Sequence, residues 1–405
     1  MHHGDNLILT LVGGFVLAFV FGMLAHRLRL SPLVGYLAAG VVVGPFTPGW
    51  VADGGAANQL AEIGVILLMF GVGLHFSPQD LMKVRRVAAP GALLQIALAT
   101  ALGWALGRWI GLGDVGSALF GFSLSVASTV VVLRTLEERR QLKSEVGRVA
   151  MGWLVVQDLV VIVALVLLPL LVGKQVEALA PAALAGEIGL KLLKVAVFVG
   201  LMFVVGGRVL PWVLVRIAHT RSRELFTLGV LAIALGIAWL AYAVFGASFA
   251  LGAFVAGLVL NGTPLGHNAA ERSLPLRDAF AVLFFVSVGM LFDPRILLSQ
   301  PLAVAGALGI VVLVGGLSAL LVARIGRLPR GEAGLLAAAL TQIGEFSFVL
   351  AGLGLTMGVL TRSTYGLVVA AAILSIALNP LLLWLAGRWA GRAAETGARP
   401  ASATA

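Results

Sequence analysis

The sequence predicts an all-α membrane protein with about 13 transmembrane helices, arranged as two inverted-topology repeats with crossed discontinuous helices. Three observations predict this class. Hydrophobic residues make up 60% of the 405 residues and charged residues only 11%, more apolar side chain than a soluble domain can bury. Apolar runs of about 20 residues, long enough to cross a bilayer as helix, recur along the chain. Segments of the first half also recur in the second half.

Short polar breaks divide the apolar sequence into successive spans. The runs lack the two-residue alternation of barrel strands, so we expect every span to be helical. The predicted spans cover about 6–25, 31–46, 58–76, 87–110, 115–136, 146–171, 187–210, 223–244, 246–261, 276–292, 301–324, 332–357 and 364–389.

These spans form one predicted transmembrane domain, residues 1–390, followed by a cytoplasmic tail of 391–405. Within the domain we expect repeat one at about 6–171, a linker helix at about 187–210 and repeat two at about 223–389. Most of the 28 Lys and Arg residues lie in one alternate set of connections. The other set contains only Arg108, Lys174, Lys191, Lys194, Arg295 and Arg362. The positive-inside rule therefore predicts an external N-terminus and a cytoplasmic C-terminus.

Charge and cysteine content exclude several functions. A net charge of +10 would favour nucleic-acid binding in a soluble domain, but here the basic residues flank membrane spans, so no nucleic-acid partner is expected. The cysteine count of 0 excludes disulfides and thiolate metal sites. We expect no cofactor, and the partners expected are the lipid bilayer and the transported ions.

An internal repeat with an offset of about 216 residues relates the two halves. The aligned segments are 67–81 with 283–297, Gly35 and Gly40 with Gly252 and Gly257, and 125–129 with 341–345. Seven spans separate the partners, so the two copies cross the membrane in opposite senses. Inverted repeats are typical of secondary transporters, whose similar halves exchange roles between inward-open and outward-open states.

Asp158 lies near the middle of the sixth span, with no Lys or Arg close to it in sequence. A carboxylate at that depth costs at least about 2.5 kcal/mol on insertion scales, which favours a functional role over a structural one. Burial disfavours an isolated negative charge, so this group is expected to hold either a proton or a metal cation. The adjacent Gln157 offers a neutral amide ligand or, equally, a hydrogen bond between packed helices.

The fifth and twelfth spans each contain a segment that weakens a helix. Small and hydroxyl-bearing residues at 125–129 and 341–345 can satisfy backbone groups that leave the helical ladder. We predict that both helices are discontinuous and cross near the midplane, with their ends facing Asp158. The alternative is a pair of continuous helices whose Ser and Thr side chains bond to the preceding turn.

The candidate site residues form two groups. The predicted cation and proton ligands are Asp158, Gln157, Ser128, Thr129 and Ser125. The predicted supports of the discontinuous helices are Gln342, Gly344 and Glu345. Glu345 either compensates the positive ends of the broken helices or serves as a second protonatable site. An enzyme is not expected, because Ser128 has no histidine in a central span to act as its base.

Six motifs carry a family resemblance across nearly all of residues 6–390. They are SPLVGYL at 31–37, EIGVILLMFGVGL at 62–74, ASTVV at 127–131, QD at 157–158, LRDAFAVLFFVSVGM at 276–290 and QIGEFSF at 342–348. Together they resemble the membrane domain of Kef-type potassium:proton antiporters in the monovalent cation:proton antiporter family, most closely its YbaL-like branch.

The resemblance implies a K⁺/H⁺ antiporter of the bacterial inner membrane. It implies a homodimer in which a core bundle, spans 3–6 and 10–13, moves as an elevator against a dimerisation scaffold. It also assigns cation and proton binding to Asp158. The alternatives are a Na⁺/H⁺ antiporter, or a cation channel or symporter on the same fold.

Two departures from the family pattern narrow this hypothesis. Members that exchange two protons for one sodium ion have an acid where Gln157 stands and a lysine in the tenth span, whereas residues 279–291 here are uncharged. A single carboxylate predicts electroneutral one-for-one exchange. Many Kef-type proteins also continue into a nucleotide-binding regulatory domain, and these residues give no basis for nucleotide or glutathione regulation.

Overall fold

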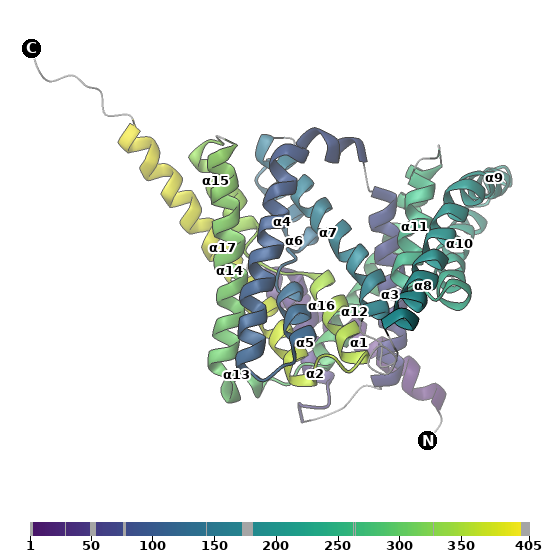
Figure 1. Ribbon diagram of the computed structural model, residues 1–405, viewed down its shortest axis with the longest axis horizontal. Coiled ribbons are helices and arrows are strands. Elements are labelled where there is room, and N and C mark those ends of the chain that lie inside the picture. The colour runs from purple at the N-terminus through teal and green to yellow at the C-terminus, as the bar shows by residue number, and fades with distance from the viewer. Residues whose placement is uncertain are drawn as a thin grey trace, which may run out of the picture. The chain divides into compact units, whose positions relative to one another are not determined.

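The computed structural model describes residues 3–28, 30–48, 54–75, 78–142, 144–171, 181–261, 263, 265–326 and 328–397. Every regular element in these ranges is a helix (Figure 1). The chain divides into two compact units. Unit 1 comprises Met1–Phe21, Gly35–Ser77 and Val160–Leu291, and unit 2 comprises Gly22–Val34, Pro78–Leu159 and Phe292–Ala405.

Unit 1 is built from long apolar helices and one π-helical turn. Pro211 cannot donate to the carbonyl of Gly207, which weakens the helical ladder just after that turn. Gly246, in a left-handed conformation with φ 67°, ends α10. The elements are most of α1 (His3–Arg27) and α2 (Pro32–Val43), α3 (Gly54–His75), the end of α7 (Glu145–Leu171), α8 (Pro181–Leu201), η1 (Met202–Gly206), α9 (Gly207–Ala218), α10 (Arg223–Phe245), α11 (Phe249–Asn261) and α12 (Gly266–Met290).

Unit 2 contains the remaining helices, two pairs of which are short. Pro301 occupies the first turn of α14, where its missing N–H has no helical partner to lose. The elements are α4 (Pro78–Trp109), α5 (Asp114–Ser123), α6 (Thr129–Glu138), most of α7, α13 (Ile296–Ser299), α14 (Pro301–Ile325), α15 (Arg330–Ala339), α16 (Glu345–Thr356) and α17 (Arg362–Gly397).

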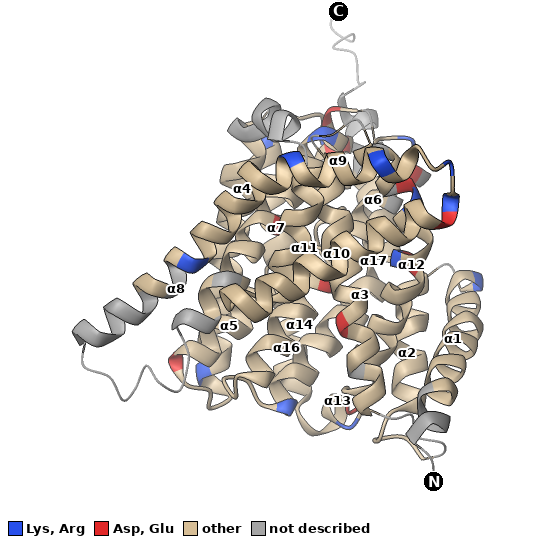
Figure 2. Cartoon of the chain, turned by 90° about the vertical axis from the view of Figure 1, so that its right-hand side faces the viewer, with Lys and Arg blue, Asp and Glu red and all other residues tan. Residues whose placement is uncertain are grey.

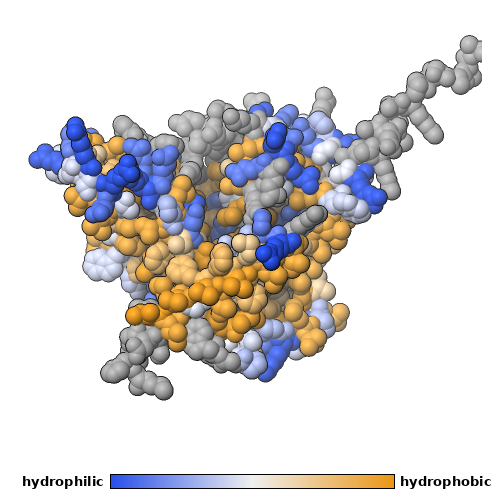
Figure 3. Space-filling view, turned by 180° about the vertical axis from the view of Figure 1, so that it is seen from behind, coloured by the Kyte–Doolittle hydropathy of each residue, from blue (hydrophilic) through white to orange (hydrophobic). Residues whose placement is uncertain are grey.

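The helices carry the surface of a multi-pass membrane protein. Among the described residues, 9 helices are long and apolar enough to cross a bilayer, and α2, α11 and α16 are shorter apolar helices. Large apolar side chains such as Leu302 and Leu317 are exposed, and apolar side chains cover much of the face in Figure 3. Charged residues lie mainly near helix ends (Figure 2). The multi-pass class is confirmed, and the count of thirteen spans stays a prediction.

Several helix boundaries differ from the predicted ones, including the start of α4 at Pro78 instead of residue 87. α12 begins at Gly266 instead of residue 276, because the helix accommodates Pro275 in its interior instead of starting after it. The seventh predicted span extends through η1 and α9 to Ala218. α17 continues to Gly397, because residues 390–397 are rich in Ala and contain no proline. The predicted tail is therefore helical at 391–397, and 398–405 lie outside the described residues.

Two glycine contacts in unit 1 support the internal repeat. Gly40 of α2 lies against Gly289 of α12, and Gly73 of α3 lies against Gly257 of α11. In each pair, a Cβ atom on either glycine would overlap the backbone of the partner helix. In the predicted repeat, Gly40 is equivalent to Gly257 and Gly73 is equivalent to Gly289. The repeat therefore converts the contact of Gly40 with Gly289 into the contact of Gly257 with Gly73. Two copies related by a two-fold axis must show this relation.

The two compact units divide the helices differently from the predicted elevator core, which stays a prediction. The family resemblance grouped spans 3 and 10 with spans 4–6 and 11–13. In the structure α3 and α12 belong to unit 1, whereas α4–α6 and α14–α17 belong to unit 2. Close backbone approach at the glycines packs α3 against α11 and α12 against α2, and Gly64 of α3 lies against the backbone of Phe280 in α12, which links the two pairs.

The glycine crossings give the first testable prediction. In Gly73→Ala the added methyl group would overlap the carbonyl oxygen of Phe254, and overpacking of this kind typically costs about 1–3 kcal/mol. We expect a lower thermal unfolding midpoint for the detergent-solubilised protein. Gly236→Ala in α10 is the control, because its Cβ meets nothing within 4 Å and alanine favours helix. Equal midpoints for the two variants would contradict the proposed packing.

Candidate functional site

Two interrupted helices meet in unit 2, as the sequence predicted. The first interruption separates α5 from α6 at residues 124–128, and the second separates α15 from α16 at residues 340–344. Ser128 caps α6 by accepting a hydrogen bond from the Val131 N–H at 3.4 Å. Gly344 precedes α16 in an extended conformation. Both interruptions thus end in the N-terminus of a helix, where backbone N–H groups and the helix dipole leave partial positive charge.

The two interruptions pair with each other through their backbones. Ala127 and Ile343 form an antiparallel β-bridge, and the Ser128 N–H donates to the carbonyl of Gln342 at 3.4 Å. The Gln342 amide donates in return to the carbonyl of Ser128 at 3.3 Å. The repeat offset places Ala127 on Ile343, so the bridge joins equivalent residues of the two halves. The prediction of two discontinuous helices that meet is confirmed.

Glycine is required where the two segments are closest. A Cβ atom at Gly344 would lie 2.5 Å from the Cα of Ser128, its equivalent in the other half. Any side chain at residue 344 would push the two interruptions apart. The two segments can approach this closely because the first has the small residue Ser128 at the contact and the second has Gly344, which has no side chain.

Side chains of α7 and α4 satisfy the first interruption. The Gln157 amide accepts from the Ala127 N–H at 3.1 Å and donates to the Ser125 carbonyl at 3.0 Å. Gln95 of α4 also donates to the Ser125 carbonyl at 3.2 Å, and its own oxygen accepts from the Trp153 indole at 2.8 Å. The side chains of Gln157, Gln95 and Trp153 are buried, where an unpaired backbone group is costly.

α17 satisfies the second interruption in an equivalent way. The Ile343 N–H donates to Ser375 Oγ at 3.5 Å. Asn379, one turn further along α17, donates to the carbonyl of Ala338 at 2.7 Å. The bond from Ile343 to Ser375 is the counterpart of the bond from Ala127 to Gln157. Each half thus uses the helix after its interruption to hold the freed backbone.

Asp158 is adjacent to the N-terminus of α6. Its side chain is 6% exposed, and Thr129, the first residue of α6, donates to Asp158 Oδ2 at 3.4 Å. The other oxygen, Oδ1, is buried and accepts no hydrogen bond from the described residues. A buried carboxylate oxygen without a donor can be satisfied by a proton or by a cation. Asp158 Oδ1 is thus available to bind a proton or a cation.

Glu345 is the second buried acid of the crossing. It is the first residue of α16 and is 3% exposed. Ser128 Oγ donates to Glu345 Oε2 at 3.4 Å. Thr129 and Glu345 are equivalent in the repeat, so each helix N-terminus carries an oxygen-bearing side chain at its first residue. An acid at this position is favoured by the partial positive charge of the helix end.

The remaining predicted residues also lie at the crossing, but they differ in which of their polar atoms have hydrogen-bond partners. Ser125 Oγ donates to the carbonyl of Phe122 at 2.7 Å, and its own carbonyl receives two amide donors. Gln157 uses both ends of its amide on the interruption. Gln342 Oε1 is buried without a hydrogen bond from the described residues, as Asp158 Oδ1 is.

Five polar side chains that hold the crossing were not among the predicted site residues. Ser347 Oγ, in the first turn of α16, donates to the carbonyl of Val126 at 3.4 Å. The others are Gln95, Trp153, Ser375 and Asn379, described above. Two of them could have been found from the sequence, because Ser375 and Asn379 are polar residues one turn apart in an apolar span. Ser375 is also close to the repeat offset from Gln157.

Comparison with known proteins gives a consistent result at several levels of similarity. A family model described as "Sodium/hydrogen exchanger, transmembrane" matches residues 15–384. The "Putative cation/proton antiporter YbaL" of Escherichia coli (strain K12) is 56% identical over 386 residues, which cover 95% of this chain and 69% of that protein. "K(+) efflux antiporter 4" of Arabidopsis thaliana is 32% identical over 387 residues, covering 94% and 64%.

A solved structure shares the fold. The sodium proton antiporter MjNhaP1 from Methanocaldococcus jannaschii, in a structure at pH 8, superposes with a TM-score of 0.64 at 18% sequence identity. The match covers 96% of this chain and 97% of that one. The likeness establishes the common helical architecture predicted from the repeat and the interrupted spans.

The Gln157 bonds yield a prediction about stability. Gln157→Leu keeps the bulk of the side chain but leaves the Ala127 N–H without its acceptor, and a buried unpaired donor costs about 1–3 kcal/mol. We expect a clearly lower thermal unfolding midpoint in detergent. Gln141→Leu is the control, because the Gln141 side chain is only partly buried and outside the crossing. The structural role of Gln157 would be refuted if both variants unfolded at the wild-type temperature.

Proposed function

The chain belongs to the sodium/hydrogen exchanger family, as its motifs indicated, and on this premise we propose that it exchanges K⁺ for H⁺ electroneutrally at Asp158. Membership rests on a family match that extends over residues 15–384. The observation that carries the proposal is the buried Oδ1 oxygen of Asp158, which no described group satisfies.

Exchange requires that cation and proton compete for one position. A proton on Asp158 neutralises the buried carboxylate, and a dehydrated monovalent cation beside it does the same. Thr129 Oγ1 is within hydrogen-bond distance of the carboxylate and is a hard oxygen ligand of the kind such cations accept. Ser128 adds a second hydroxyl at the same helix end. The empty carboxylate carries an uncompensated charge, so the site favours occupancy by one ion or the other.

We assign Ser125 and Gln157 to the support of the site instead of to its ligands. The Ser125 carbonyl already accepts from two amides, which fills its two lone pairs. The Gln157 amide holds a backbone donor and a backbone acceptor. A cation that recruited either group would leave a buried polar atom unpaired.

A single titrating carboxylate accounts for electroneutral stoichiometry. One cation enters as one proton leaves, so the net charge of the site is the same in both states. In this proposal Glu345 keeps its charge throughout, because it receives a hydrogen bond from Ser128 and stands at the N-terminus of α16.

Potassium is the cation we favour. The support comes from relatives named as K(+) efflux antiporters, one of which is 32% identical over 94% of this chain. Sodium is the second candidate and is the named substrate of MjNhaP1, a protein with a similar fold. Both ions accept carboxylate, hydroxyl and carbonyl oxygens, so the same site serves either exchange.

We further propose an elevator mechanism in a homodimer of the bacterial inner membrane, with the N-terminus outside and the C-terminus in the cytoplasm. Every residue of the crossing belongs to unit 2, and we assign unit 2 to the moving body. The orientation follows from the distribution of Lys and Arg among the connections. A cation channel or a symporter on this fold is the competing function.

Asp158→Asn tests the shared site directly. The amide cannot exchange a proton for a cation, so we expect K⁺-driven proton movement in proteoliposomes, followed with an internal pH dye, to fall to the level of protein-free liposomes. Asp114→Asn is the control, since that carboxylate is 73% exposed and pairs with Arg108 at 3.5 Å. Exchange that survives in Asp158→Asn would overturn the mechanism. K⁺ flux without counter-movement of protons in the wild type would instead establish a channel.

Glu345→Gln distinguishes between two roles for Glu345, a fixed negative charge and a second proton-binding site. The glutamine side chain still accepts from Ser128, so we expect exchange within about threefold of wild type and no net current on a supported membrane, where a threefold change corresponds to about 0.65 kcal/mol. Glu224→Gln, at an exposed position in the first turn of α10, controls for loss of an acid. If Glu345→Gln abolishes exchange or makes it electrogenic, Glu345 carries a transported proton.

A further inference from the structure

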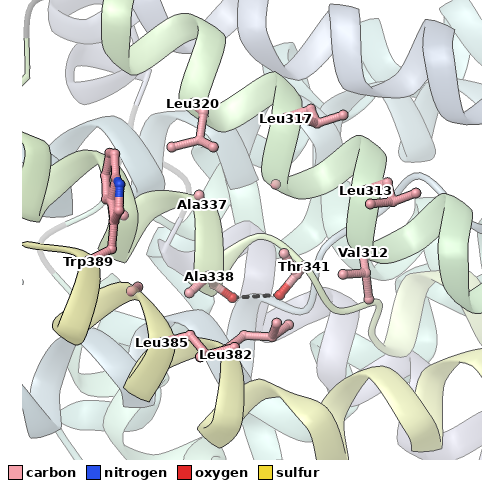
Figure 4. Close-up of a pocket in the computed structure, with 13 residues that line it drawn as sticks. Val312, Leu313, Leu317, Leu320, Ala337, Ala338, Thr341, Leu382, Leu385 and Trp389 are labelled. Carbon is pink, nitrogen blue, oxygen red and sulfur yellow. Dashed lines mark hydrogen bonds between the residues drawn. The ribbon is translucent and has the colours of Figure 1, made fainter.

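A groove opens between three helices of unit 2, apart from the candidate ion site. It has a volume of about 340 Å³ and lies between α14, α15 and α17 (Figure 4). Its walls are almost wholly apolar, with Leu313, Leu317 and Leu320 on α14 facing Leu382, Leu385 and Trp389 on α17. A volume of this size is within the range of small-molecule sites.

Small residues keep the groove open. The nearest atom to a Cβ built on Gly316 is the Thr341 methyl group at 3.4 Å, and a Cβ on Gly334 would meet Ala386 and Trp389 at the same distance. Ala337 and Ala338 of α15 contribute only methyl groups to the lining. Larger side chains at these positions would fill the space. The groove therefore exists because the sequence has glycine and alanine there.

Three arginines lie within one helical turn, along the chain, of residues that line the end of the groove where Trp389 lies. Arg324 is one helical turn beyond Leu320 on α14, Arg330 is one turn before Gly334 on α15, and Arg388 is next to Trp389. All three are exposed, and none forms an ion pair with a described residue. Arg388 lies over the ring of Trp384 at 4.4 Å, which is an attractive cation–π contact.

The charges near this end of the groove are mainly positive, although one acidic residue lies in the same region. Glu332, in the first turn of α15, is the described acidic residue closest in sequence to these arginines. Three arginines against one glutamate leave an excess of positive charge at the mouth of an apolar groove. Phosphodiester groups are bound by arginine in this way, and basic pockets between transmembrane helices typically bind anionic lipid head groups.

We propose that this groove binds one acyl chain of an anionic phospholipid whose phosphate is held by Arg324, Arg330 and Arg388. The apolar walls suit a hydrocarbon chain and provide little for a polar ligand. Trp389 and Trp384 have the amphipathic rings that residues at the interface between hydrocarbon and head groups commonly have. The occupant is therefore a membrane lipid with a net negative head group, as opposed to a soluble phosphate compound.

The bound chain touches the second helix interruption. Thr341 lines the groove at the end of α15, and its hydroxyl donates to the carbonyl of Ala338 at 2.7 Å (Figure 4). An acyl chain in the groove covers the last turn of α15 and excludes water from the carbonyls at its end. The lipid thus stabilises one of the two segments that form the crossing.

Thermal unfolding in detergent with added phospholipid tests the head-group contacts. Phosphatidylglycerol should raise the unfolding midpoint more than phosphatidylcholine with the same acyl chains. We expect R324Q/R330Q/R388Q to lose that difference and R208Q/R216Q/R223Q to keep it. The control removes three exposed arginines from unit 1, including Arg216, which lies over Trp212 at 5.6 Å. Equal stabilisation by the two lipids, or an undiminished difference in the first triple variant, would overturn the proposal.

Native mass spectrometry tests the groove. Gly316→Phe places a ring inside it, so we expect at least a tenfold loss of retained phosphatidylglycerol relative to wild type. Gly309→Phe, on the same helix with nothing within 4 Å of its Cβ, should retain the lipid. Retention by Gly316→Phe would refute the acyl-chain site. Soluble glycerol phosphate should not stabilise the protein, and stabilisation equal to that by phosphatidylglycerol would show that only the phosphate is bound.

Discussion

The backbone pairing of Ala127 with Ile343 is the interaction on which the rest of unit 2 depends. An interrupted helix at membrane depth frees N–H and C=O groups that no water reaches, and each unpaired group there is costly. The chain satisfies these groups by placing one interruption against the other. Gln157 and Ser375 then accept from the two N–H groups at the bridge. The carboxylate of Asp158 is held at this crossing because α7 must be there to complete the bonding.

The two halves of the crossing use similar parts in different positions. In the first half a threonine begins α6 and the acid, Asp158, is on α7. In the second half the acid, Glu345, begins α16, and a serine of α17 binds the interruption. Each acid also receives a hydroxyl donor at 3.4 Å, from Thr129 and Ser128 respectively. The duplicated backbone is thus nearly symmetric, whereas the arrangement of charge is not. Of the two acids at the crossing, Asp158 is the one with a buried oxygen that no described group satisfies.

The interruptions could be predicted from the sequence because their cause is local. The Ser, Thr and Gly residues at 125–129 and 341–345 lower the local helix propensity, and the repeat offset related the two segments. The role of Gln157 could not be predicted, because it depends on which backbone atoms α7 meets after folding. Gln95 and Trp153 are linked for the same reason, through packing between residues far apart in the chain. The start of α12 was predicted too late because a proline commonly marks a helix boundary, whereas Pro275 is internal here.

The glycine crossings of unit 1 have a mechanical consequence. Side chains in a packed interface can change rotamer, and an interface built from them can slide by small steps. At the contacts of Gly40 with Gly289 and of Gly73 with Gly257, backbone touches backbone, and there is no rotamer to change. Interiors packed this closely have low compressibility and transmit strain. We therefore expect the two glycine crossings to change little when unit 1 deforms, because a shift there has to move helix backbones.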